Sequence, residues 1–278
     1  MKNPIGVMQG RLVPKYKGRY QAHPLGYWQD EFLVANELGL AFIEFILDFN
    51  DAEANPLLSQ DGKSEILEQV AATGVLVKTI CADYFMEAPL HSADAGVAAA
   101  SLDVLRRLLF RAAEIGVSDV VIPCVDHASL RDSHMVDNFV NAVKPLLGML
   151  DKLNINLSLE TDLNPSDFKA LLERFDSPRI TVNYDTGNSA ALGYDPVEEL
   201  SAYGDKITDI HIKDRVLGGG PVVLGTGDTE FERFFTKLKE LDYQGPFIMQ
   251  AFRDDEGVKV FKEQLVWIRE YMEIWYTR

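Results

Sequence analysis

The chain has 278 residues, of which 47% are apolar and 10% aromatic, so it can bury a large core. Its formal net charge of −16 disfavours binding to nucleic acid or to anionic membranes, because both depend on Lys and Arg side chains that neutralise phosphates. Neither an apolar run of about 18 residues nor the apolar core of a signal peptide is found in the sequence, which favours a cytoplasmic protein.

Eight short β-rich runs alternate with helical patterns along the chain. They are IGVMQ (5–9), AFIEFI (41–46), VLVKTIC (75–81), DVVIPC (119–124), INLSLE (155–160), ITVNYD (180–185), ITDIHIK (207–213) and PFIMQ (246–250). Near-continuous apolar runs are typical of parallel strands that are covered on both faces. The two cysteines, Cys81 and Cys124, end two of these runs, where we expect buried, reduced thiols.

Three of the intervening helices carry start signals. In NPSD, Asn164 can cap a helix whose first position is Pro165, and DPVE repeats this pattern from Asp195. The motif TEFE, residues 229–232, predicts a capping box that starts at Thr229. The helix that follows should bury one face, formed by Phe231, Phe234, Phe235, Leu238 and Leu241.

The spacing of the strand ends predicts the fold. Successive ends are 25 to 43 residues apart, which suits one strand and one helix per unit, repeated eight times. We therefore predict an α/β protein with a single domain, residues 1–278, folded as a (β/α)8 TIM barrel. An open doubly wound sheet is the competing architecture, but it would normally need a GxGxxG loop after an early strand, and none is present there.

Four consecutive strands, from the fifth to the eighth, end in polar side chains. These are Glu160, Asp185, His211 and Gln250. Neighbouring strands of a barrel bring their carboxyl ends together, so the four groups can converge on one part of its mouth. Two carboxylates, an imidazole and an amide oxygen predict one divalent metal ion, with Mn²⁺, Co²⁺ or Zn²⁺ favoured over Mg²⁺, which stays a further candidate.

The motifs LSLE, VNYDTGN, DIHIKDR and PFIMQAFRD resemble those of the xylose-isomerase-like TIM barrels. This family includes sugar and sugar-phosphate isomerases and 3-epimerases and, more distantly, the endonuclease IV group. The resemblance covers essentially the whole chain and implies that Glu160, Asp185 and His211 are metal ligands. It also implies that Gln250 stands where the family usually has a fourth ligand, a Glu. In the family's epimerases the two Glu residues move protons on opposite faces of the substrate.

The expected chemistry is proton transfer beside a carbonyl through a metal-stabilised enediolate. Glu160 is the predicted catalytic proton carrier, whereas the amide of Gln250 can bind a metal but cannot act as a base. Return of the proton to the same face of the substrate gives aldose–ketose isomerisation, which is then the simpler outcome. Epimerisation would need a second acid/base, for which Glu44 and Asp83 are candidates by strand position.

Polar residues at or just after the strand ends are candidate substrate-binding groups. They are Arg11, Glu44, Asp83, His127, Asn188, Lys213, Arg215 and Arg253. Lys213 and Arg215 begin the glycine-rich segment 211–228, whose backbone amides and cations suit a phosphate or another anion. Arg253, in the next loop, would add a forked donor.

We expect a sugar or sugar-phosphate isomerase/epimerase whose partner is a small carbohydrate, free or phosphorylated. A metal-dependent dehydratase or lyase of a keto-polyol would use the same enediolate chemistry, and a non-catalytic sugar-binding relative is favoured by the loss of the usual Glu at position 250. An endonuclease-IV-like hydrolase is disfavoured, because it needs many His ligands and a basic surface and this chain has five His residues and a net charge of −16. The sequence is compatible with a monomer or a homodimer.

Overall fold

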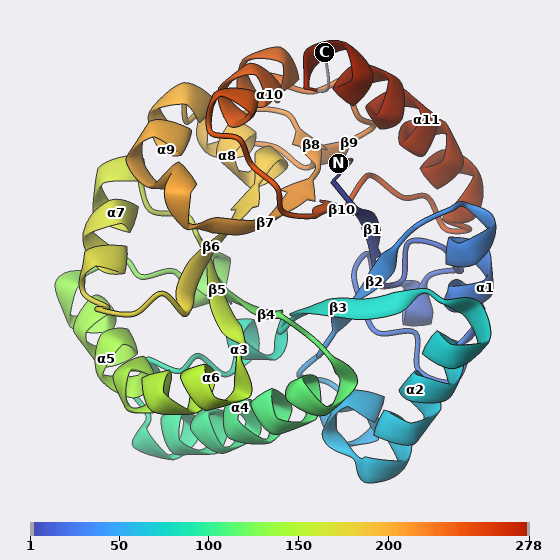
Figure 1. Cartoon of the computed structure of the whole chain (residues 1–278). Coiled ribbons are helices and arrows are strands. Elements are labelled where there is room, and N and C mark those ends of the chain that lie inside the picture. The colour runs from blue at the N-terminus through green and yellow to red at the C-terminus, as the bar shows by residue number, and fades with distance from the viewer. Residues whose placement is uncertain (1–2, 277–278) are drawn as a thin grey trace.

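The computed structural model describes residues 3–276, in which eight parallel strands close into a barrel surrounded by helices (Figure 1). Around the barrel the strands follow the order β1-β10-β7-β6-β5-β4-β3-β2. Their bounds are β1 Ile5–Met8, β2 Phe42–Ile46, β3 Leu76–Cys81, β4 Asp119–Cys124, β5 Asn156–Thr161, β6 Ile180–Asp185, β7 Ile207–Ile212 and β10 Phe247–Met249. The predicted TIM barrel is therefore confirmed. The predicted single domain also includes residues 1–2 and 277–278, which lie outside the described residues.

The helices form a ring outside the strands (Figure 1). Their bounds are α1 Asp30–Glu37, α2 Gln60–Thr73, α3 Tyr84–Glu87, α4 Ala95–Ile115, α5 Ser133–Val143, α6 Leu147–Leu153, α7 Pro165–Glu173, α8 Thr186–Leu192, α9 Pro196–Tyr203, α10 Phe231–Glu240 and α11 Val258–Trp275. Within residues 3–276, none of these helices combines the length and the apolar character that crossing a membrane requires.

Each predicted run corresponds to one strand of the barrel, but three runs extend one residue past the strand, and the fifth run stops one residue before β5 ends at Thr161. Gln9, Lys213 and Gln250 lie just past the ends of β1, β7 and β10 and so belong to the loops at the mouth. A short antiparallel pair, β8 (Asp214–Arg215) with β9 (Pro221–Val222), was not predicted. It forms within the glycine-rich segment, where two-residue strands leave too short a pattern to recognise.

Two of the three predicted helix starts are confirmed by their caps. Asn164 accepts a hydrogen bond from the backbone N–H of Asp167 at 3.0 Å, and Asp195 caps α9 in the same way. The capping box at Thr229 is wrong, because α10 begins two residues later and its N-cap residue makes no side-chain cap. The Thr229 hydroxyl instead lies 3.3 Å from the carbonyl oxygen of Lys213, so it supports the loop after β7.

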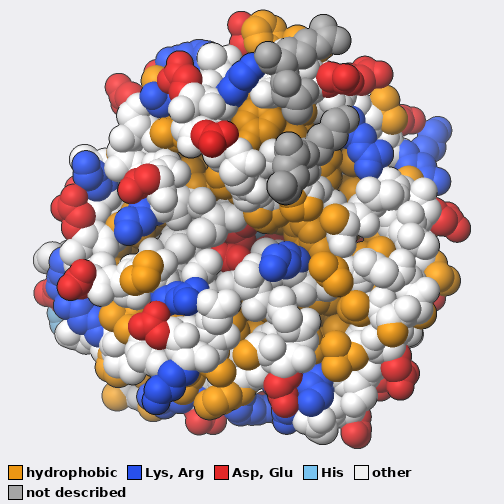
Figure 2. Space-filling view, in the orientation of Figure 1, with side chains coloured by type: hydrophobic (Ala, Val, Ile, Leu, Met, Phe, Trp, Pro, Cys, Tyr) orange, Lys and Arg blue, Asp and Glu red, His pale blue; other side chains and the backbone are white. Residues whose placement is uncertain are grey.

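Apolar side chains pack on both sides of the sheet. The larger core lies between strands and helices and includes the apolar face of α10, except that Leu241 stays 37% exposed. A smaller buried cluster, formed by Met8, Phe42, Ile46, Cys81, Val121 and Ile248, alternates with it along the strands and so fills the barrel interior. Cys81 and Cys124 are both buried free thiols, as predicted. In Figure 2, which shows one face of the barrel, acidic side chains are visible at the centre.

Candidate functional site

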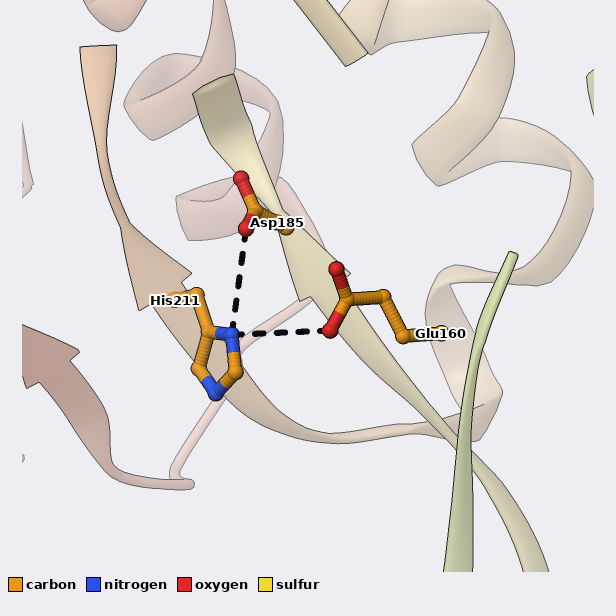
Figure 3. A group of neighbouring side chains, drawn as sticks. All are labelled: Glu160, Asp185 and His211. Atoms are coloured by element: carbon orange, nitrogen blue, oxygen red, sulfur yellow. Dashed lines mark ion pairs between the residues drawn. The ribbon is translucent and has the colours of Figure 1, made fainter. Parts of the chain in front are cut away.

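Glu160, Asp185 and His211 meet at the carboxyl ends of three neighbouring strands, β5, β6 and β7 (Figure 3). The Nδ1 atom of His211 lies 3.7 Å from Oε2 of Glu160 and 3.8 Å from Oδ2 of Asp185. One ligand atom from each residue falls within 4.8 Å of the others, and all three side chains are buried. Buried carboxylates and an imidazole that face one point fit a single divalent cation.

The His211 ring is held from behind by Glu44 on β2. Its Nε2 atom lies 2.8 Å from Oε2 of Glu44, and neither side chain is exposed to solvent. A carboxylate at one ring nitrogen fixes the ring so that the other nitrogen points at the metal position. The structure thus places Glu44 behind His211 and not at the surface where a substrate would lie, because a side chain at the middle of a strand points into the barrel below the mouth.

Two asparagines organise the carboxylates. Asn188, at the start of α8, donates from Nδ2 to Glu160 at 2.6 Å and from its backbone N–H to Asp185 at 2.8 Å. Asn183, which sequence reasoning missed, places its Nδ2 3.1 Å from both Glu160 Oε2 and His211 Nδ1. The sequence contains a signal that could have predicted this role. Residues two apart on a strand share a face, and Asp185 follows Asn183 at that spacing.

The cluster shifts the pKa of each of its members. Burial raises the pKa of Glu160 to about 7, and the Asp185 charge adds to the rise. Burial also opposes ionisation of Asp185, but the Lys213 ammonium and the His211 ring outweigh it and hold its pKa below the ordinary value. For His211, Glu44 and Asp185 outweigh the effect of burial and hold the pKa well above its usual range. The site therefore favours positive charge at its centre.

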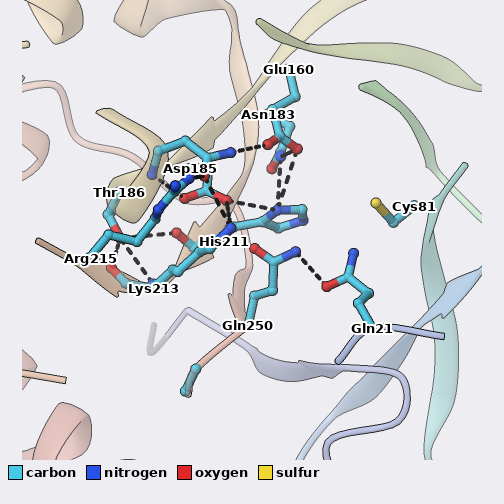
Figure 4. A network of polar contacts seen from close by, with 12 residues as sticks. Gln21, Cys81, Glu160, Asn183, Asp185, Thr186, His211, Lys213, Arg215 and Gln250 are labelled. Atoms are coloured by element: carbon cyan, nitrogen blue, oxygen red, sulfur yellow. Dashed lines mark hydrogen bonds and ion pairs between the residues drawn. The ribbon is translucent and has the colours of Figure 1, made fainter. Parts of the chain in front are cut away.

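Gln250 follows directly after β10, the strand next to β7. Its Nε2 donates to Oε1 of Gln21 at 2.9 Å, and its own Oε1 is buried with no hydrogen-bond partner among the described residues. β10 pairs with β7, which carries His211, and Figure 4 shows the bond from the Gln250 amide to Gln21. A buried acceptor with no partner is rare in folded proteins. The amide oxygen thus fits a fourth ligand to the same cation.

A cavity of about 320 Å³ opens above the cluster. Seven of the predicted site residues line it, namely Arg11, Asp83, Glu160, Asn188, Lys213, Arg215 and Gln250. Tyr20 and Gln21, from the loop after β1, also line it and were not predicted. That loop has no periodic pattern that would have placed these two side chains at the mouth.

Residues 32–271 match the protein family described as xylose isomerase-like TIM barrel. The chain belongs to this family. The L-ribulose-5-phosphate 3-epimerase of Salmonella paratyphi A is 28% identical over 235 residues, which cover 82% of this chain and 83% of the relative. The enzyme of the same name from Escherichia coli O1:K1 / APEC is 27% identical over 256 residues, 88% and 90% of the two chains.

Solved structures with similar folds include other epimerases. An L-ribulose 3-epimerase has a TM-score of 0.77 at 17% identity and covers 98% of this chain and 95% of its own. The 3-keto-D-glucoside 4-epimerase of Escherichia coli has a TM-score of 0.76 at 17% identity, with 97% and 100% covered. At such low identity these structures show a common fold and nothing finer.

Two predicted residues of this family member lie away from the cavity. His127 is exposed in a short turn at 126–128 and does not line it. Arg253 is buried and donates to the carbonyl oxygens of Gly10 and Val13, so its guanidinium joins two loops. Arg11 does reach the cavity, but its donors already bind Gln21 and the carbonyl oxygens of Ala251 and Tyr20.

The glycine-rich segment is also largely satisfied from within. The buried Asp214 carboxylate accepts from the backbone N–H groups of Gly225 and Gly227, both at 2.9 Å, and of Thr229 at 3.1 Å. Gly225 and Gly227 belong to the glycine-rich segment predicted to bind an anion, and a carboxylate of the chain itself already accepts from their amides. The positive charge that faces the cavity comes instead from Lys213 and Arg215.

Proposed function

We propose that the protein is a divalent-metal-dependent epimerase of a ketose or a ketose phosphate. The observation that carries the proposal is the buried cluster of Glu160, Asp185 and His211, whose ligand atoms lie within 4.8 Å of one another beside the cavity that Glu160 lines. Burial raises the pKa of Glu160 to about 7. A carboxyl group with that pKa can take up and release a proton in each turnover. The relatives at 27% to 28% identity, which are sugar-phosphate 3-epimerases by name, support this reaction class.

The chain's residues divide the work as follows. A divalent cation held by Glu160, Asp185, His211 and the amide oxygen of Gln250 would stabilise negative charge on the substrate's oxygens. Glu160 removes the proton from the carbon beside the carbonyl, and the electron pair of that bond moves towards the carbonyl oxygen. Asn188 orients the Glu160 carboxylate through its bond at 2.6 Å. The imidazole in this donor set favours Mn²⁺, Co²⁺ or Zn²⁺ over Mg²⁺.

A phosphorylated substrate would place its anion beside Lys213 and Arg215. Arg215 is anchored by two bonds to the carbonyl oxygen of Gly219, at 2.9 and 2.7 Å, and by one to Asn188 at 2.8 Å. Lys213 Nζ bonds Asn188 Oδ1 at 3.1 Å, so both cations converge on the same edge of the cavity. In a chain with a net charge of −16, this local positive charge supports an anionic substrate.

The test is proton exchange in D₂O, followed by NMR. L-ribulose 5-phosphate and a panel of free and phosphorylated ketoses are incubated with the protein after chelator treatment and again with Mn²⁺, Co²⁺ or Zn²⁺. We expect deuterium at the carbon beside the carbonyl, and the epimer as product, only after metal is restored. An aldose would indicate isomerisation, and a dehydrated product would indicate a lyase.

Gln250 favours a second candidate, a non-catalytic sugar-binding relative, because the amide removes one of the two carboxylates that the family's epimerases use. The same experiment separates the two. Binding of a sugar phosphate with no proton exchange for any substrate, with every metal tried, would exclude the epimerase and support the binding protein.

A further inference from the structure

Epimerisation needs a second group that gives a proton to the face opposite Glu160, and an amide at position 250 cannot do so. Glu44 and Asp83 were the two candidates from strand position. The Oε2 atom of Glu44 is hydrogen-bonded to His211 Nε2 at 2.8 Å, and Glu44 lies below the mouth. Asp83 lines the cavity together with Glu160. The structure therefore separates two residues that the sequence left equivalent.

Asp83 approaches the cavity from the side that faces the metal cluster. It follows β3, and β3 lies opposite β7 in the ring of strands. Figure 4 shows Cys81, at the end of β3, on the other side of the site from Asp185 and Lys213. A substrate that contacts His211 on one side can thus contact Asp83 on the other. Glu160, on β5, enters the cavity wall two strands away from Asp83, so the two carboxyl groups approach a substrate from different directions.

A chain of amides fixes the Asp83 carboxylate in place. Gln250 Nε2 donates to Gln21 Oε1 at 2.9 Å, and Gln21 Nε2 donates to Asp83 Oδ2 at 2.9 Å. Arg11 also donates to Gln21 Oε1, at 3.0 Å, which fixes the direction of the Gln21 amide. A Glu at position 250 would turn a carboxylate towards this acceptor oxygen. The amide at 250 and the carboxylate at 83 are therefore matched parts of one network.

We propose that Asp83 is the second acid/base group and exchanges a proton with the face of the reacting carbon opposite Glu160. This inference rests on the proposed epimerase function. Glu160 takes the proton from one face while the electron pair of the C–H bond moves to the carbonyl oxygen. Asp83 then gives its proton to the other face, the electron pair returns to form the new C–H bond and restores the carbonyl, and solvent resets both carboxyl groups.

The surroundings of Asp83 suit a group that must hold a proton before it donates. Burial raises the pKa of Asp83 above its ordinary value, and the charges of Asp48 and Glu44 add to the rise. Hydrogen bonds from Gln21 and from the Cys81 thiol, at 3.2 Å, oppose it by stabilising the ionised form. The protonated form of Asp83 is thus easier to reach at the cavity wall than in water.

The test compares the two epimers of one substrate pair, L-ribulose 5-phosphate and its 3-epimer, in D₂O with the Asp83→Asn variant. The parent should exchange the proton of both. In Asp83→Asn, epimer formation should fall by about 10²-fold or more. The epimer that Glu160 deprotonates should still exchange its proton without inversion, whereas the other should not. Glu160→Gln should show the opposite preference, and a structural role for Asp83 would slow both epimers alike.

Readouts that do not depend on turnover keep the result interpretable. Metal content by elemental analysis, and binding of the non-reacting ligand L-arabinitol 5-phosphate by calorimetry, should stay within about twofold of the parent in Asp83→Asn, because Asp83 is not a ligand in this scheme. Asp255→Asn removes a carboxylate from an exposed ion pair with Lys15 and should behave as the parent. Asp83→Ser serves as a second variant, with the same expected asymmetry.

Two results would overturn the inference while leaving the proposed function intact: equal loss of exchange from both epimers, or no loss of epimer formation. If the parent itself exchanges no proton in any substrate, the proposed function fails and the inference fails with it.

Discussion

Two buried carboxyl groups, Asp185 on β6 and Asp209 on β7, lie at different depths in the barrel, and their pKa values are shifted in opposite directions. At the mouth, Asp185 has its pKa lowered although it is buried, because the Lys213 ammonium and the His211 ring lie beside it. Deeper inside, Asp209 precedes His211 on β7, and its pKa is raised well above the ordinary value by burial and by the charges of Asp119 and Glu44. Burial is common to both, so the neighbouring cations make the difference.

The hydrogen bonds of the two groups agree with this contrast. Asp185 accepts bonds from Asn188 and Lys213 at 2.8 and 3.1 Å, as an ionised carboxylate should. Asp209 accepts one bond, from Ser158 at 3.0 Å, and its second oxygen has no partner among the described residues. Asp209 does not line the cavity, and its raised pKa favours the neutral form, so it is best understood as a barrel residue below the site.

The largest expected effect comes from removing the proton carrier at the mouth. Glu160→Gln should lower kcat for epimerisation by about 10²–10⁴-fold, which is the usual contribution of a positioned general base. Asp209→Asn, an equally conservative change in the deeper layer, should leave kcat within a few-fold of the parent. Steady-state kinetics with both variants checks this, and similar losses in the two would remove the distinction between the layers.

Removal of the support behind His211 should weaken metal binding. In the parent, His211 Nε2 lies 2.8 Å from the Glu44 carboxylate. Glu44→Gln keeps the shape of the side chain but offers His211 a poorer acceptor. Loss of such an orienting carboxylate typically costs about 10–100-fold in metal affinity. Glu53→Gln, which alters an exposed ion pair with Arg107, is the control and should change nothing. Isothermal titration with Co²⁺ measures both, and unchanged affinity in Glu44→Gln would argue against a metal position at His211 Nδ1.

The raised pKa of Asp209 should make the stability of the protein depend on pH. Because the pKa of Asp209 is raised in the folded protein above its ordinary 3.8, the folded chain keeps a proton that the unfolded chain releases. The stabilisation is fully present below the pKa of Asp209 in the unfolded chain. It is lost as the pH rises from there to the pKa of Asp209 in the folded protein. The Asp209→Asn variant does not suffer this loss. The difference in the free energy of unfolding between the variant and the parent should therefore increase with pH, by up to about 1.4 kcal/mol per pH unit. Urea unfolding between pH 5 and 8 is the measurement, and a constant difference would mean that Asp209 is ionised.

The smallest effect is expected at the anion edge of the cavity. Arg215→Gln should raise KM for a phosphorylated ketose several-fold and leave the KM for its free form nearly unchanged. Added salt should narrow the difference between the two substrates in the parent, since it screens the attraction to Lys213 and Arg215. Equal changes for both substrates would place the phosphate elsewhere.

The barrel and its metal cluster were predictable because both follow from periodic patterns. Apolar runs at regular spacing predict the strands, and the end of each strand places Glu160, Asp185 and His211 at the same mouth. The partners of loop residues were not predictable. Arg253 looks free in the sequence, yet backbone carbonyl oxygens occupy its guanidinium. The amides of Gly225 and Gly227 look available for an anion in the sequence, yet the carboxylate of Asp214, which lies between Lys213 and Arg215, accepts from both.

The roles of Glu44 and Asp83 also could not be distinguished from the sequence. Both follow from strand position as candidate acids, but only three-dimensional contacts show that Glu44 binds His211 while Asp83 faces the cavity. The amide chain from Gln250 to Asp83 passes through Gln21, a loop residue with no pattern around it. Such networks depend on which loops meet, and this is decided by the closed fold.

The claim that the mouth cluster is a metal site is tested most directly by titrating metal-free protein with Co²⁺ while following both heat and the visible absorption of the bound ion. We expect one ion per chain, with imidazole and carboxylate ligation, whose binding releases protons because the pKa values of His211 and Glu160 are raised. Asp185→Asn should weaken this binding by at least tenfold. Saturation with no bound ion, or unaltered binding in Asp185→Asn, would contradict it.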